Sequence, residues 1–111
     1  MDILDNYRQI IEKVLMQQTK TSYANVSVQN EAIFDHNHNR YCIISSGWDG
    51  VRRIHSCLIH IDIIDQKVWI QRDDTEDGIA YELEEAGIPK TSIVLGFKDV
   101  EVRKYTGYAV A

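Results

Sequence analysis

This sequence of 111 residues lacks the usual features of membrane, secreted and metal-binding proteins. It has no apolar run of about 18 residues, so no segment predicts a membrane-spanning helix. Its N-terminus lacks the basic start and cleavage site of a secretory signal. Its two cysteines, Cys42 and Cys57, form neither a C-x-x-C motif nor a zinc-ligand spacing. We therefore expect a single cytoplasmic domain over residues 1–111, with reduced thiols.

Basic residues and catalytic motifs are also few. The chain has 12 lysines and arginines against 17 aspartates and glutamates, which gives a net charge of −5 and a pI of about 5.2. Because sequence-independent DNA binding usually needs a basic surface, this balance disfavours it, although a local basic patch stays open. There is no glycine-rich phosphate loop and no Ser-His-Asp arrangement. We expect no catalytic residue, no bound metal and no cofactor.

The stretch Trp48–Arg72 contains two turn signals and the longest β-rich run of the chain. Asp49-Gly50 is typical of a two-residue hairpin turn, in which both central residues have positive φ. Asp65-Gln66 is a second, weaker turn signal, because glutamine tolerates positive φ less well than glycine. Together the two turns predict a three-stranded antiparallel meander.

The two turns also predict which side chains share a sheet face. Counting outward from the first turn places Cys42 opposite Cys57, and counting from the second places Ile61 opposite Ile70. Because side chains alternate along a strand, one face is expected to form the core. Its members are Cys42, Ile44, Cys57, Ile59, Ile61, Ile63, Val68 and Ile70. The other, mixed face has Ile43, Ile54, Leu58, His60, Asp62, Trp69 and Gln71. This register would also allow a Cys42–Cys57 disulfide, which a reducing compartment disfavours.

Helical and further strand patterns flank this centre. Apolar residues at spacings of three and four predict a helix over residues 1–19 that covers the apolar sheet face. Its stripe is Ile3, Leu4, Tyr7, Ile10, Ile11, Val14 and Leu15. Strands are expected over residues 26–35 and 41–47, with a polar loop between them. The pattern is typical of an α+β fold with an antiparallel β-meander sheet of at least four strands.

The acidic run Asp73–Asp77 is expected to begin a second helix, near residues 76–86. Asp74 or Thr75 is its predicted N-cap, and Gly87 followed by a proline is expected to end it. Ile79, Ala80, Leu83 and Ala86 would form its buried stripe. Beyond it we expect a short apolar run at residues 93–95, a charged exposed segment at 98–104, and an apolar end docked on the body or on a partner.

Two groups of residues could form metal-dependent sites, and each also has a simpler explanation. His36 and His38 would need further ligands, such as His60 and Asp62, to bind zinc, and nothing in the sequence brings these together. We therefore interpret them as exposed loop histidines and a sheet-face residue.

A metal-dependent nuclease could use Asp62, Asp65 and Lys67, with the two carboxylates on Mg²⁺. Asp65 and Lys67 are also ordinary hairpin-turn residues, and this explanation is favoured. The acidic run could bind a cation or a basic partner, but helix capping is favoured.

One basic and aromatic group remains. Arg52 and Arg53 beside Trp48 could contact phosphate while the indole stacks on a base, and Lys104 could extend such a DNA-binding patch. Structural or protein-interface use is favoured, because two arginines are few for DNA binding. We predict Trp48, Arg52, Arg53 and Trp69 as interface residues.

Several short motifs, weak singly but specific in their order and spacing, carry a resemblance. They are Tyr7–Ile11, Trp48-Asp49, Arg52-Arg53, His60–Ile63, Lys67–Gln71, Asp73, Thr75-Glu76, Gly87–Lys90, Ile93–Phe97, Arg103, Tyr105-Thr106 and Ala109–Ala111. Over nearly its whole length the sequence resembles the XisI-like family, the fdxN element excision controlling factors of cyanobacteria. It departs from the family pattern at Gln66, where glycine is frequent, and in residues 98–101, which lack proline.

The resemblance implies an accessory role in the programmed excision of a DNA element in nitrogen-fixing cells. The strand exchange in that process belongs to a separate recombinase, and a nuclease-like companion, XisH, is often encoded next door. The resemblance therefore implies a non-enzymatic regulator that acts through protein contacts with a XisH-like partner. It transfers no catalytic residue. We also expect the chain to form a homodimer.

Overall fold

A five-stranded sheet forms the centre of the fold in the computed structural model, which describes residues 2–20 and 27–111. The elements in chain order are α1 (Ile3–Gln18), β1 (Ser27–Asp35), β2 (Arg40–Asp49), β3 (Arg52–Ile64), β4 (Lys67–Asp73), α2 (Ile79–Glu85), a 3₁₀ turn (Lys90–Ser92), β5 (Ile93–Leu95) and α3 (Val100–Arg103). Strands β1 to β4 form an antiparallel meander, and β5 pairs in parallel with β4. The α+β prediction is confirmed, and the parallel fifth strand adds to it.

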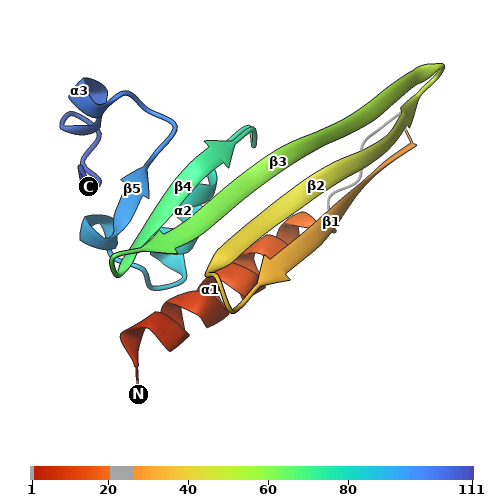
Figure 1. Ribbon diagram of the computed structural model, residues 1–111. Helices are drawn as coiled ribbons and strands as arrows, with labels where there is room; N and C mark the ends of the chain where they lie inside the picture. The colour runs from red at the N-terminus through yellow and green to blue at the C-terminus, as the bar shows by residue number, and fades with distance from the viewer. Residues whose placement is uncertain (1, 21–26) are drawn as a thin grey trace.

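Helix α1 follows its predicted apolar stripe except at its start, where Ile3 is 57% exposed. Its N-cap is Asp2, whose carboxylate accepts a hydrogen bond from the backbone N–H of Leu4 at 3.1 Å. Tyr7, Ile11, Val14 and Leu15 are its buried residues. Helices α1 and α2 lie on the same face of the sheet (Figure 1). The first helix therefore covers the apolar sheet face, as predicted. Met1 and Val26, at the predicted starts of this helix and of the first strand, lie outside the described residues.

The second turn has the predicted register. Asp65 and Gln66 both have positive φ, 50° and 67°, as a type I′ turn requires. Ile61 lies opposite Ile70, and both side chains are fully buried. The same register places Ile63 and Val68 in the core. The turn therefore forms without a glycine.

The register predicted for the first hairpin is wrong. Asp49 pairs with Arg52, so the loop residues are Gly50-Val51 and not Asp49-Gly50. Each β2 residue near the turn therefore lies opposite a β3 residue two positions later than predicted. A shift of two residues leaves each side chain on its predicted face of the sheet. A β-bulge then changes the faces, because Leu58 is one extra residue between the partners of Ile43 and Ile44.

The bulge determines which β2 residues enter the core. Tyr41 and Ile43 are fully buried. Cys42, Ile44 and Cys57, which were predicted in the core, are half-buried on the opposite face. Cys42 lies opposite His60 and not opposite Cys57. The predicted geometry for a disulfide is therefore lost, and both cysteines are free thiols.

Helix α2 begins three residues later than predicted. Its N-cap is Gly78, with φ of 87°, and not Asp74 or Thr75. Asp73 takes over the capping role from the end of β4, because its carboxylate accepts a hydrogen bond from the N–H of Ile79 at 2.7 Å. The remaining residues of the predicted stripe, Ala80 and Leu83, are buried with Ile79, whereas Ala86 is exposed. Gly87, with φ of 121°, follows the helix end as predicted.

The C-terminal segment docks on the body of the molecule. The N–H of Ala109 donates to the carbonyl of Ile93 at 2.9 Å, and Ala109 forms an isolated bridge with Val94. Tyr108 donates a hydrogen bond to Glu84 of α2. Most of residues 98–104 is exposed, as predicted.

Strands β1, β2 and β3 continue beyond the rest of the sheet. Strand β4 pairs with β3 only from Ile59 to Ile64, so Arg52–Leu58 lies past its end. We call residues 27–31 and 44–58 the arm, and residues 48–53 the arm tip. At about 3.3 Å per residue, the arm projects roughly 20 Å beyond β4. Figure 1 shows the arm tip at one end of the molecule and α3 at the other. No helix in the described residues is long and apolar enough to cross a membrane.

Candidate functional site

The arm tip brings together three of the four predicted interface residues. Trp48 lies directly opposite Arg53 across the hairpin, and the guanidinium carbon lies 5.2 Å from the centre of the indole ring. The guanidinium group also donates to the carbonyl of Gly47 and to the hydroxyl of Ser46, each at 3.3 Å. These contacts bring the guanidinium group of Arg53 against the indole of Trp48.

The remaining tip side chains are open to solvent. Trp48 is 49% exposed and Val51 is fully exposed. Arg52 lies 3.6 Å from the carboxylate of Asp49, and both side chains are well exposed. Such exposed ion pairs contribute little, so Arg52 keeps the freedom to contact another molecule. The tip is therefore a cationic, aromatic surface.

The fourth predicted interface residue lies elsewhere. Trp69, on β4, is half-buried, and the guanidinium carbon of Arg103 lies 5.1 Å from its ring centre. The C-terminal segment therefore packs on this indole. The proposed DNA-binding patch is not assembled either, because Lys104 lies beside α3 and pairs with Glu101 at 2.7 Å. The arm tip is at the opposite end of the molecule (Figure 1).

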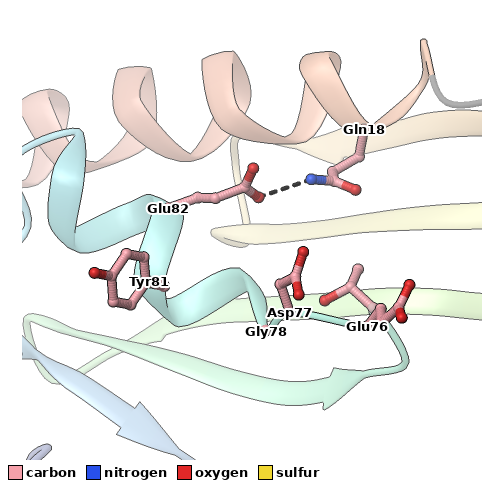
Figure 2. A pocket seen from close by; sticks show the side chains of 7 residues that line it. Gln18, Glu76, Asp77, Gly78, Tyr81 and Glu82 are labelled. Atoms are coloured by element: carbon pink, nitrogen blue, oxygen red, sulfur yellow. Dashed lines mark hydrogen bonds between the residues drawn. The ribbon is translucent and has the colours of Figure 1, made fainter.

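An acidic hollow lies between the end of α1 and the start of α2. It has a volume of about 510 Å³ and is lined by Gln18, Thr75, Glu76, Asp77, Gly78, Tyr81 and Glu82. Figure 2 shows the amide of Gln18 donating to the carboxylate of Glu82, at 2.7 Å. Tyr81 is 64% exposed beside it. No basic side chain is among the lining residues. We call these seven residues the hollow.

The sequence predicted that the acidic run Asp73–Asp77 caps a helix, and it gave no indication of the hollow. The run lies between β4 and α2, but the other wall comes from Gln18, more than fifty residues earlier. Only the packing of α1 beside α2 brings these residues together. A glutamine at the end of an apolar stripe gives no signal of that contact.

Three of the four histidines lie beside carboxylates. His36 lies 3.0 Å from Glu12, and His38 lies 2.8 Å from Asp35. His60 lies 2.9 Å from Asp62 on the sheet face away from the helices. Within residues 2–20 and 27–111, no three His, Cys, Asp or Glu side chains gather closely enough to hold a metal ion.

The two thiols lie on the same open sheet face. Both are half-buried, and burial raises the pKa of the Cys42 and Cys57 thiols above their ordinary value. Because the thiolate is the reactive form, this environment disfavours nucleophilic chemistry at either sulfur.

Comparisons with known proteins agree over the whole chain. The family model described as XisI protein matches residues 1–110. A XisI-like protein of known structure from Anabaena variabilis is 36% identical, with 97% of this chain and 99% of that chain covered and a TM-score of 0.87. The solved fdxN element excision controlling factor XisI from the same organism is 32% identical, with coverages of 99% and 100% and a TM-score of 0.82. No curated protein matches the sequence.

Proposed function

Because this chain belongs to the XisI family, we propose that it is a controlling factor for the excision of a DNA element and acts through protein contacts, without catalysis of its own. The name of the related Anabaena variabilis protein, an excision controlling factor, supports a regulatory role. The proposed partner is a XisH-like, nuclease-like protein in the cytoplasm.

The exposed arm tip is the observation that carries this proposal. Tryptophan and arginine are the residues most enriched among those that dominate binding at protein interfaces. Here Trp48 and Arg53 are already held together by their stacking, so little conformational entropy is lost when a partner binds. Val51 adds a fully exposed apolar side chain. We assign the partner contact to Trp48, Arg52 and Arg53. Trp69 is left out of it, because the C-terminal segment packs on its indole.

The test is co-expression of this chain with a XisH-like protein, followed by native mass spectrometry. A discrete complex of the two chains is expected. Arg52→Ala with Arg53→Ala should abolish it, whereas the matched loss of two exposed positive charges in Lys13→Ala with Lys98→Ala should leave it intact. Equal effects of the two double variants, or no complex with the unchanged chain, would reject the assignment.

Direct DNA binding by the arm tip is the second candidate, because a stacked Trp-Arg pair also suits bases and phosphates. Two arginines neutralise about two phosphates, so the logarithm of affinity should fall with the logarithm of salt at a slope near −1.8. Gel shifts on duplex and single-stranded DNA across salt would measure this slope. The absence of any shift at low salt would remove the candidate.

A further inference from the structure

We propose that the hollow binds the arm tip of a second copy of this chain. This goes beyond the proposed function, although it uses the same arm. The hollow presents the carboxylates of Glu76, Asp77 and Glu82 with no basic side chain among its lining residues. The tip carries the exposed side chains of Arg52 and Arg53, the latter beside the Trp48 ring. The two surfaces are complementary in charge, which favours their association.

The chemistry of the hollow suits an arginine more closely than a bare positive charge. Glu76 and Asp77 are exposed, so an incoming guanidinium group can reach both carboxylates directly. Carboxylates bind guanidinium groups in a bidentate manner, and aromatic faces such as that of Tyr81 stack on them. Glu82 is already oriented by Gln18 (Figure 2). A hollow of about 510 Å³ is within the size range of sites that enclose small ligands, and has room for an arginine side chain.

The occupant is a second copy because each copy carries both halves of the contact. When two copies exchange tips, each tip occupies the other's hollow, and both contacts are made at once. Such a reciprocal arrangement is closed, so assembly stops at two. The roughly 20 Å projection of the arm gives it the reach that an exchange requires.

This arrangement has a consequence for regulation. A tip seated in a second copy is not available to another protein, so the dimer and the proposed complex with a XisH-like partner compete for Arg52 and Arg53. Variants of the hollow should therefore lose the dimer and keep the partner. Variants of the tip should lose both.

A charge-exchange experiment tests the contact directly. One chain carries Arg52→Glu with Arg53→Glu, and a second carries Glu76→Lys with Asp77→Lys. In each chain alone, tip and hollow have like charges. In a mixture of the two chains, both contacts of the pair are complementary. We expect the unchanged chain to be a dimer by native mass spectrometry and sedimentation, and each variant alone to dissociate at least about tenfold more readily. The mixture should give a mixed dimer.

The control variant is Glu85→Gln with Glu101→Gln, which removes two exposed acidic charges outside the hollow and the arm and should leave the dimer unchanged. Circular dichroism establishes that each variant is folded. A monomeric unchanged chain, a dimer that both variants retain, or a mixture without mixed dimers would overturn the proposal. Partner binding that survives in the hollow variant while mixed dimers are absent would refute this inference alone. Mixed dimers without any partner complex would refute the proposed function alone.

Discussion

The guanidinium carbon of Arg103 lies 5.1 Å from the centre of the Trp69 ring. The Nε atom of Arg103 donates to the carbonyl of Lys98 at 3.0 Å, and its terminal nitrogens donate to the carbonyls of Gly96 and Val110, each at 3.4 Å. One side chain therefore joins β4 to three points of the C-terminal segment. Arg103 therefore covers the indole, and this explains why Trp69 is half-buried although it lies on the open face of the sheet.

Arg103→Ala should loosen the C-terminal segment. It removes the stacking on Trp69 and leaves three carbonyls without their donor, so we expect the free energy of unfolding to fall by about 2 kcal/mol. Urea denaturation measures this change. Lys104→Ala is the control, because its exposed ion pair with Glu101 is expected to contribute less than about 0.5 kcal/mol. Equal losses in the two variants would contradict a specific role for Arg103.

Gly47→Ala should detach β1 from the arm. A Cβ atom at this position would lie 1.9 Å from the backbone carbonyl oxygen of Ser27, so the two strands could not keep their spacing. We expect a loss of more than about 2 kcal/mol in the free energy of unfolding. Gly50→Ala is the comparison, because its Cβ would meet open space. Its φ of 62° limits the expected loss to about 1 kcal/mol. A smaller loss of stability in Gly47→Ala than in Gly50→Ala would contradict the prediction that β1 and β2 cannot accommodate a Cβ atom at position 47.

Asp73→Ala should fray the start of α2. The carboxylate accepts hydrogen bonds from the N–H and hydroxyl of Thr75 and from the N–H of Ile79. Since Gly78 has no side chain to cap the helix, we expect a loss of about 2 kcal/mol and faster hydrogen exchange at Ile79. The neighbouring Asp74→Ala removes an exposed carboxylate that pairs with Arg72 and should have little effect. Unchanged exchange at Ile79 in the Asp73 variant would rule out this capping role.

The extra residue Leu58 decided which sheet faces could be predicted from the sequence. Counting from the Asp65-Gln66 turn gave the correct core residues Ile61, Ile63, Val68 and Ile70, because no bulge lies between that turn and Ile61. Counting from the other turn gave the wrong face for β2 and for Cys57 of β3, because the extra residue Leu58 inverts the alternation. Nothing in the local pattern indicates such a bulge, since two neighbouring apolar residues fit either register.

Of the candidate site, only the part formed by residues close in sequence could be predicted. Trp48, Arg52 and Arg53 are close in sequence across a hairpin, so their proximity could be predicted even with a shifted turn. The surroundings of Trp69 and the hollow depend on contacts between segments far apart in the chain, such as that between Gln18 and Glu82. Those contacts follow from how the helices and the C-terminal segment pack, which spacing alone does not encode.

Tyr108 should make stability fall at high pH. Burial, together with the hydrogen bond that its hydroxyl donates to Glu84, raises the pKa of Tyr108 to about 12. In the unfolded chain the pKa is near 10. The folded state therefore holds this proton more tightly, and the resulting stability is complete below about pH 10 and is lost as the pH rises through about 12.

Tyr108→Phe tests this pH dependence by removing the titrating group. We expect it to lower the free energy of unfolding by about 1 kcal/mol near neutral pH, because Glu84 loses its donor. Between about pH 10 and 12 the difference from the unchanged chain should shrink, since the unchanged chain loses the contribution of the hydroxyl there. Tyr105→Phe is the control, because that side chain is 81% exposed. Urea denaturation at a series of pH values measures both variants. A difference between Tyr108→Phe and the unchanged chain that stays constant across this range would mean that the Tyr108–Glu84 contact does not hold the proton.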